Sequence, residues 1–297
     1  MVKRLAENTV KPTVKQGTYE KYGRVINKQI LPKLGECDLN DLTATALQTY
    51  TAELSIKYSA NTVNGVVAVI RNSLQRACQI GLTDRQFADS IKRPKTVEKQ
   101  VECFSTAEQK KIESYILRSK KDKLFGIILC LYTGLRIGEL LALKWEDIDF
   151  KKALISITKA CRDSWENGKY VKQIDTPKTA TSKRLIPMPG QLLQPLKALK
   201  KRSKSDMVVS SDTAEQISIR SYQRTFELIL NKLKIPHKGF HALRHTFATR
   251  AIECGMDVKT LSEILGHKNS TITLNRYTHS LLEHKTAMMN KLGKLFD

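Results

Sequence analysis

A stretch near the C-terminus, "LGHKNSTITLNRYTHS" (Leu265–Ser280), combines residue types that suit an attack on phosphate. His267 follows a glycine, and Tyr277 stands ten residues later between an arginine and a threonine. A tyrosine that only packs needs no such neighbours. A phenol has a pKa of about 10, so it becomes a good nucleophile only among positive charges. The stretch therefore predicts Tyr277 as a candidate nucleophile.

Three other segments contain residues that suit the same reaction. "TGLRIGELLALKWEDID" contains Arg136 and Glu139, "HALRHTFATRAIECG" contains His241 and Arg244, and "TPKTATSKRLIPM" contains Lys178. A phosphodiester under attack gains negative charge on its non-bridging oxygens, which planar guanidinium groups hold through paired hydrogen bonds. Histidine, or a lysine with a lowered pKa, can supply the proton that the leaving alkoxide needs. Together the segments predict phosphoryl transfer to a tyrosine.

This chemistry requires no cofactor. A covalent phosphotyrosine exchanges one phosphodiester for another, so the broken strand can be rejoined without ATP. His241 and His245 are four residues apart, and a metal pair is the alternative interpretation. The metalloprotease pattern requires a glutamate directly after the first histidine, whereas Ala242 stands there. We therefore expect neither a metal nor a cofactor.

The predicted helix that begins near His241 sets the direction of its side chains. His241 and Arg244 are three residues apart and so share a face of the helix. A different, apolar stripe is expected to point inward, and it consists of Leu243, Phe247, Ala251 and Cys254. Arg244 is thereby predicted to lie near a fixed surface rather than to move freely in solvent.

The charge of the chain indicates its partner. The 51 Lys and Arg residues outnumber the 29 Asp and Glu residues, giving a formal net charge of +22. Residues 1–99 hold 16 basic and 9 acidic side chains and the remainder holds 35 and 20, so both parts are basic. Such a surface attracts polyanions, with nucleic acid as the leading partner and an anionic membrane as the weaker alternative. Because aromatic residues make up only 6%, contact with the backbone of duplex DNA is favoured over stacking on single strands.

The sequence also indicates where the protein is found. No run approaches the roughly 18 apolar residues of a membrane span, and the N-terminal residues lack the apolar core of a secretory signal. The six cysteines are scattered without a C-x-x-C pair, which indicates reduced thiols rather than disulfides or zinc ligands. We expect a cytoplasmic, nucleoid-associated protein with no membrane partner.

The spacing of apolar residues divides the chain into parts. Residues 1–92 predict a helical unit, and the Lys-rich residues 93–104 with Pro94 predict a linker. Residues 105–280 predict a mainly helical domain, and residues 281–297 predict a tail helix. Within these parts, Thr43 is a predicted N-cap, Ser105 and Glu108 have capping-box spacing, and residues 124–132 predict a buried helix. One helix stripe is predicted to be buried, at Val63, Val67, Ile70, Leu74 and Ala77.

A small antiparallel sheet is predicted inside the second part. The three predicted strands are Ala153–Ala160, Lys169–Thr176 and Lys183–Met188. Asn167 and Gly168 predict a hairpin turn between the first two strands, and Pro177–Ser182 would form the turn between the second and third. The fold class is therefore mainly α with a small antiparallel β-sheet.

The candidate residues, taken in chain order, resemble the site of the tyrosine recombinase family, which includes phage and conjugative-transposon integrases. They are Arg136, Lys178, His241 with Arg244, Gly266 with His267, and Tyr277. The resemblance extends over nearly the whole chain, and it is specific because several segments match together. It implies a helical core-type DNA-binding domain at residues 1–92 and an α+β catalytic domain at residues 105–280, closing as a clamp round duplex DNA.

The resemblance also implies a role for each residue. Tyr277 would attack the scissile phosphate and leave a 3′-phosphotyrosine and a free 5′-hydroxyl. The other residues would hold the phosphate or move protons: Arg136 and Arg244 grip it, His267 hydrogen-bonds it, Lys178 protonates the leaving 5′ oxygen, His241 helps with protons, and Glu139 orients the site.

The resemblance further implies a tetramer on two paired DNA recombination sites, with residues 281–297 docking on a neighbouring protomer. An accessory DNA-bending or directionality factor is a further candidate partner. Integrases of this type often carry an N-terminal arm-site domain, and we expect either a simple two-domain member or a shortened one. Two alternatives stay open: a type IB topoisomerase with similar chemistry, and a non-catalytic DNA-binding regulator that has kept the fold.

Overall fold

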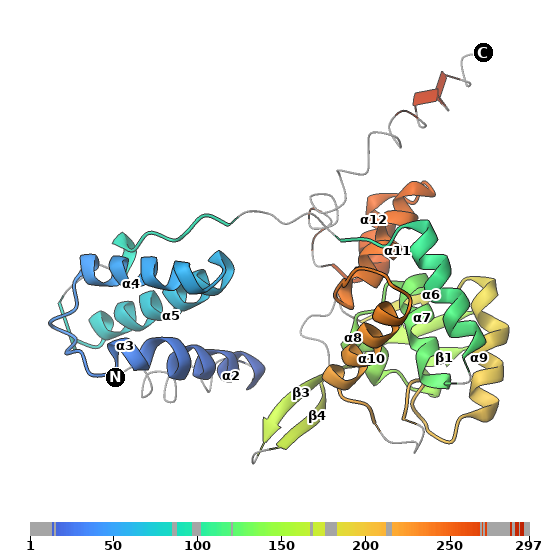
Figure 1. The fold of residues 1–297 in the computed structure, drawn as a ribbon, viewed down its shortest axis with the longest axis horizontal. Coiled ribbons are helices and arrows are strands. Elements are labelled where there is room, and N and C mark those ends of the chain that lie inside the picture. The colour runs from blue at the N-terminus through green and yellow to red at the C-terminus, as the bar shows by residue number, and fades with distance from the viewer. Residues whose placement is uncertain are drawn as a thin grey trace. The chain divides into compact units, whose positions relative to one another are not determined.

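The computed structural model describes residues 14, 16–84, 88–96, 102–119, 121–166, 169–175, 183–211, 216–267, 269, 271, 286, 289–290 and 292–293. The chain forms two compact units, Met1–Lys99 and Gln100–Asp297 (Figure 1). This division falls inside the linker predicted at residues 93–104. The finer domain boundaries stay a prediction.

The first unit consists of helices around one apolar core. Its elements are α2 (Gln16–Val25), the π-helical turn η2 (Ile26–Ile30), α3 (Leu31–Leu34), α4 (Ala44–Lys57), α5 (Ala60–Gln79) and the 3-10 turn η3 (Ala88–Ser90). The stripe predicted on α5 is buried as expected, at Val63, Val67, Ile70, Leu74 and Ala77. The predicted cap is also confirmed, because the Thr43 hydroxyl accepts a hydrogen bond from the amide of Ala46 at 3.1 Å.

The run from α2 to α3 is helical, as predicted, but it contains a π turn that the sequence pattern does not reveal. Pro32 lacks an N–H group and cannot donate to the carbonyl of Lys28, four residues before it. The neighbouring amide of Leu31 bonds to the carbonyl of Ile26, five residues back. The proline thus explains why the regular ladder widens at this point.

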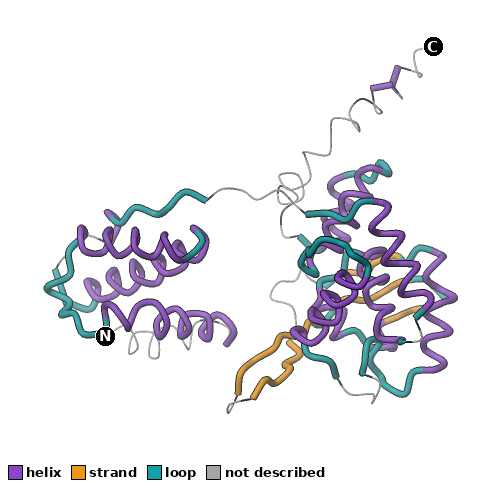
Figure 2. Tube along the Cα trace, viewed as in Figure 1, coloured by secondary structure: helices purple, strands orange, loops and turns teal. Residues whose placement is uncertain are grey.

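The second unit combines helices with short strands (Figure 2). Its apolar core is larger than that of the first unit. Its helices are α6 (Thr106–Arg118), α7 (Phe125–Thr133), α8 (Ile137–Ala142), α9 (Gly190–Arg202), α10 (Ile219–Lys232), α11 (His241–Glu253) and α12 (Val258–Leu265), with the 3-10 turns η4 (Asp122–Leu124) and η5 (Trp145–Asp147). The buried helix predicted at residues 124–132 is confirmed by α7, which is buried along nearly its whole length. No helix of the described residues is long and apolar enough to span a lipid bilayer.

The strands of this unit form two sheets rather than the single sheet that we predicted. Strands β1 (Ile148–Asp149), β2 (Leu154–Ile157) and β5 (Arg184–Pro187) form one antiparallel sheet in the order β1-β2-β5, and β3 (Ala160–Glu166) pairs with β4 (Lys169–Asp175) in a second. The single strand predicted at Ala153–Ala160 was wrong, because the chain leaves β2 at Ile157 and begins β3 at Ala160. The predicted pairings of β4 with the first and third strands were also wrong, since β4 pairs with β3 and β5 pairs with β2.

The length of the hairpin turn explains why β4 pairs with β3 and not with β2. A two-residue hairpin turn joins strands that end directly beside it, so the partner of β4 must end at residue 166. Strand β3 meets this condition, and the register pairs Glu166 with Lys169. Asn167 and Gly168 themselves lie outside the described residues.

A capping box fixes the start of α6, as the sequence predicted. The Ser105 hydroxyl accepts from the amide of Glu108 at 3.1 Å, and the Glu108 carboxylate accepts from the amide of Ser105 at 2.8 Å. We expect Ser105→Ala to lower the free energy of unfolding by about 1 kcal/mol, because one amide of the first turn loses its acceptor. Thermal denaturation measures the effect, with Ser114→Ala on the exposed face of α6 as the control. Equal stability of the two variants would contradict the role of the cap.

Candidate active site

The site is built around the C-terminal end of α12. The helix ends at Gly266, which has a φ of +64° and a left-handed conformation that favours glycine. The last carbonyl groups of a helix lack intrahelical donors, and they carry the negative end of the helix dipole. This end of α12 is therefore suited to bind cations.

Three arginines from different elements donate to three successive carbonyl oxygens at this helix end. The bonds run from Arg184 Nε to Ile264 O at 2.6 Å, from Arg244 Nη2 to Leu265 O at 2.6 Å, and from Arg136 Nη2 to Gly266 O at 3.2 Å. The three side chains come from β5, from α11 and from the residue that precedes α8. The helix end thus gathers charges from segments that are far apart in the sequence.

Arg244 is the most enclosed of the three. Its side chain is almost fully buried, and Nη1 also donates to the carbonyl oxygen of Gly134 at 2.8 Å. Its Nη2 lies 2.9 Å from Nε2 of His267. Because a guanidinium group only donates, this contact requires Nε2 of His267 to accept, which places the ring proton on Nδ1. Arg244 is therefore held in place rather than moving freely in solvent, as predicted, and its carbonyl partners bury it inside the unit.

Glu139 holds the other two arginines. Its buried carboxylate accepts from the amide of Arg136 at 2.9 Å and from Nη1 of Arg136 at 2.8 Å. Arg184 donates to the two carboxylate oxygens through Nη1 at 3.0 Å and Nη2 at 2.8 Å. Burial raises the pKa of Glu139, but the hydrogen bond and charge of Arg184 together with Arg136 outweigh it and lower the pKa to about 2. Glu139 is therefore an ionised anchor for both guanidinium groups.

Arg184 is the residue that sequence reasoning missed. A single arginine in a short strand resembles an ordinary solvated charge, so nothing in its residue type marks it. The alternation along β5 was a usable signal, because Arg184 lies on the same face as Ile186 and Met188, which are both buried. The structure buries Arg184 between Glu139 and the end of α12.

His241 occupies a different position from the other candidates. It is the exposed first residue of α11, and its ring packs edge-on against the ring of His245, with 4.7 Å between the centroids. His241 and Arg244 are three residues apart on α11, as predicted, but His241 is exposed whereas Arg244 is buried. Among the residues that the structure describes, no group of three or more His, Cys, Asp or Glu residues gathers as metal ligands would.

Two predicted site residues, Lys178 and Tyr277, lie outside the described residues, as does the predicted tail helix in most of its length. In the sequence, Lys178 lies between β4, which ends at Asp175, and β5, which begins at Arg184.

The geometry of this cluster suits the binding of an anion. A guanidinium group has five N–H donors, so one side chain can hold the protein and a phosphate oxygen at once. The side chain of Arg136 is 36% exposed, which lets a ligand reach it, whereas Nε, Nη1 and Nη2 of Arg184 each bond to Ile264 or Glu139. We infer that Arg136 faces the ligand, while Glu139 and Arg184 fix its direction.

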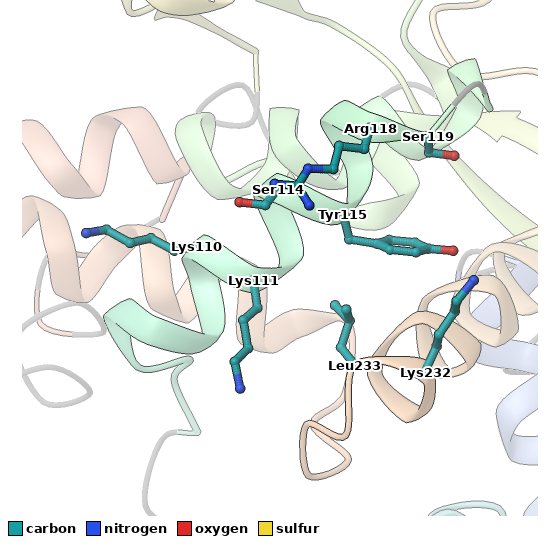
Figure 3. Close-up of a pocket in the computed structure, with 8 residues that line it drawn as sticks. All are labelled: Lys110, Lys111, Ser114, Tyr115, Arg118, Ser119, Lys232 and Leu233. Atoms are coloured by element: carbon teal, nitrogen blue, oxygen red, sulfur yellow. The ribbon is translucent and has the colours of Figure 1, made fainter.

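A separate hollow lies between α6 and the end of α10 (Figure 3). It is lined by Lys110, Lys111, Ser114, Tyr115, Arg118, Ser119, Lys232 and Leu233. The Nζ atom of Lys232 lies 5.1 Å from the centroid of the Tyr115 ring, a cation–π contact. Of the described residues that were predicted for the site, none lines this hollow, so it is not the site gathered at α12.

Comparison with known proteins identifies the family. Residues 96–284 match the model described as the phage integrase family, and residues 7–55 match the N-terminal SAM-like domain of phage integrases. A "Tyrosine recombinase XerC-like" protein of Caldanaerobacter subterraneus is 36% identical over 220 residues, which are 67% of this chain and 56% of that protein. The matched region thus spans little more than half the length of this relative.

Two further proteins are similar over almost the whole chain. The "Transposase from transposon Tn916" of Enterococcus faecalis is 29% identical over 316 residues, covering 97% of this chain and 76% of that protein. The solved structure of the Tn1549 transposon integrase in complex with circular intermediate DNA has a TM-score of 0.80 and 25% identity, covering 98% of this chain and 99% of that one. The mainly helical fold and the recombinase family predicted from the sequence are confirmed. The chain belongs to the phage integrase family of tyrosine recombinases.

Proposed function

We propose that this chain is a site-specific recombinase of a mobile element that cuts and rejoins duplex DNA through a 3′-phosphotyrosine on Tyr277. The cluster at the end of α12 carries the proposal. Arg136, Arg244 and His267 come from three separate segments and gather there. The similarity to proteins named for Tn916 and Tn1549 supports the role in a mobile element.

In the proposed reaction, the Tyr277 hydroxyl gives up its proton with the help of His241, and its oxygen attacks the phosphorus and forms a new P–O bond. The bond between phosphorus and the 5′ oxygen breaks, and Lys178 donates a proton to that oxygen. Arg136, Arg244 and His267 stabilise the charge on the non-bridging oxygens, with His241 assisting the proton transfers. The free 5′-hydroxyl of another strand then reverses the step and releases the tyrosine.

The number of copies follows from the chemistry. Exchange between two duplexes breaks four strands in total, and each copy of the chain supplies one Tyr277. We therefore propose a tetramer on two paired sites, with residues 281–297 linking neighbouring protomers. The DNA would place the protein at the nucleoid, and an accessory bending or directionality factor would select between integration and excision.

The experiment that tests this function uses a duplex with a nick close to the scissile phosphate. The short fragment beyond the cut diffuses away, so the covalent adduct should accumulate and survive SDS. The DNA that flanks the coding region, where inverted half-sites are expected, provides the substrate, and a scrambled duplex is the control. Binding without any adduct would favour the regulator. Relaxation of supercoiled DNA without exchange between sites would favour the topoisomerase.

A substitution of Arg136 should affect the rate of cleavage without affecting stability. We expect Arg136→Lys to slow adduct formation by about 10²–10³-fold, because lysine keeps the charge but loses the planar pair of donors. The side chain is 36% exposed, so the melting temperature should change little. Single-turnover cleavage and thermal denaturation measure the two effects, with Arg118→Lys on the exposed side of α6 as the control. Cleavage at the wild-type rate would remove Arg136 from the phosphate site.

A further inference from the structure

The β3–β4 hairpin carries a pair of opposite charges that are bonded to the ends of two helices. Asp163 on β3 lies directly opposite Lys172 on β4 in the register of the hairpin. Directly opposite residues project from the same face of an antiparallel pair. Each side chain nevertheless bonds to the end of a different helix.

Asp163 binds the beginning of α10. Its Oδ1 accepts from the amide of Ile219 at 3.1 Å, and its Oδ2 accepts from the amide of Arg220 at 3.2 Å. These are the first two residues of a 14-residue helix, whose N-terminal amides lack intrahelical acceptors. A carboxylate at this position also complements the positive end of the helix dipole.

Lys172 binds the opposite kind of helix end. Its Nζ donates to the carbonyl oxygen of Leu141 at 2.7 Å, close to the last residue of α8. The amide of Trp145, which would continue the helix by bonding to Leu141, donates instead to the carbonyl of Asp206 at 2.9 Å. Burial lowers the pKa of Lys172, and the nearby Cys161 and Asp163 oppose this shift. The ammonium group thus supplies a donor to a carbonyl that the helix itself does not satisfy.

The hairpin also lies very close to the backbone of α8. A Cβ atom built at Gly138 would stand 2.5 Å from the carbonyl oxygen of Cys161 on β3, so only glycine permits this approach. Helix α8 follows Arg136 directly and contains Glu139. The base of the hairpin therefore has a fixed position relative to the arginines of the site.

The hairpin is followed in the sequence by the segment that contains Lys178. Strand β4 ends at Asp175, three residues before Lys178, and β5 begins at Arg184. Strand β5 is fixed by its pairing with β2 and by the bonds of Arg184. We propose that Asp163 and Lys172 are positioning residues that hold β4 so that Lys178 reaches the leaving 5′ oxygen. The inference rests on the proposed role of Lys178 as the general acid.

The test replaces the leaving oxygen by sulfur. In a duplex with a 5′-bridging phosphorothiolate at the scissile position, the P–S bond breaks and a thiolate leaves without needing a proton. A variant that lacks only the general acid, or only its correct position, should therefore recover on this substrate. A variant with a damaged phosphate site or a damaged fold should stay slow on both substrates.

We expect Lys178→Ala to slow cleavage of the oxygen substrate by about 10²–10⁴-fold, which is the usual contribution of a general acid. Lys172→Met should slow it by about 10²-fold, as a misplacement of about 1 Å does. Both variants should regain nearly the wild-type rate with sulfur, whereas Arg136→Lys should not. The double variant with both lysines replaced should be no slower on oxygen than Lys178→Ala. Lys159→Met removes a lysine just before the same hairpin, where it faces Glu146 at the surface, and serves as the control.

Different outcomes would overturn the role of Lys178 as the acid and the positioning role of Asp163 and Lys172. If Lys178→Ala does not recover with sulfur, the assignment of Lys178 as the acid fails, and the positioning role fails with it. If Lys178→Ala recovers but Lys172→Met does not, or Lys172→Met is as fast as wild type on oxygen, only the positioning role is overturned. Recovery of Lys172→Met alone would make Lys172 itself the acid. Asp163→Asn provides the same comparison if Lys172→Met fails to fold.

Discussion

Replacing Tyr277 by phenylalanine is expected to abolish the covalent protein–DNA adduct while leaving the affinity for DNA unchanged. The substitution removes one oxygen atom and no charge. Because the phenol oxygen is the atom proposed to attack phosphorus, no neighbouring group should replace it, and the loss should exceed that of any arginine or lysine variant. Gel electrophoresis in SDS measures the adduct, and a mobility shift without SDS measures binding.

Tyr115→Phe is the matched control for this experiment. Tyr115 belongs to the same unit and lines the separate hollow beside α6, so it shares the chemistry of Tyr277 but not its proposed role. The control should form the adduct at the wild-type rate. An adduct of normal yield in Tyr277→Phe would assign the attack to another residue.

The second large effect is expected from Arg184→Met. Arg184 and Glu139 are each 6% exposed at the side chain, and Arg184 also donates to the carbonyl of Ile264. Removing one partner of a buried ion pair typically lowers the free energy of unfolding by about 3–5 kcal/mol, because the other charge stays buried. Adduct formation should fall as well, since Glu139 and Arg136 lose their fixed geometry. Thermal denaturation and single-turnover cleavage measure the two losses.

Two further variants test whether the loss of stability in Arg184→Met comes from the broken ion pair with Glu139. Lys183→Met changes the exposed neighbour of Arg184 and should be nearly neutral for stability. Glu139→Gln combined with Arg184→Met removes both buried charges, so the double variant should lose clearly less stability than the two single losses added together. Strict additivity would show that the two side chains do not act as a pair.

The dependence on pH gives an independent check of Arg184→Met. The pKa of Glu139 is lowered from 4.5 to about 2, so its contribution to stability is complete above about pH 4.5 and is lost as the pH falls toward 2. Without Arg184, the pKa of Glu139 should be lowered less, because only Arg136 then opposes the effect of burial. The difference in melting temperature between wild type and Arg184→Met should therefore be largest above pH 4.5 and should narrow below it. A constant difference down to pH 2 would contradict the ionised pair.

The candidate site was only partly predictable from the sequence. Arg136, Arg244 and His267 stand in segments whose residue types suit phosphate chemistry, so their selection needed no coordinates. The way in which they meet was not predictable, because it depends on three carbonyl groups at the end of α12, and every residue has a carbonyl group. Arg184 was missed for the same reason, since its partners are a backbone oxygen and a glutamate 45 residues away.

The fold shows the same division between local and long-range information. The caps at Thr43 and Ser105 and the stripe on α5 depend on neighbours within a few residues, and all were predicted correctly. The strand pairing was not predicted correctly, because β2 and β3 are separated only by Thr158 and Lys159. Neither residue is a glycine or proline, so no local signal marks the point where the chain passes from one sheet to the other.

The proposed reaction requires Tyr277 to become covalently bound to the DNA. The most direct measurement is to trap the adduct on nicked duplex, digest it with a protease and a nuclease, and identify the modified peptide by mass spectrometry. We expect a nucleotide phosphate on Tyr277, in a peptide drawn from Leu265–Ser280. A phosphate on any other residue, or a trapped complex without a covalent bond, would contradict it.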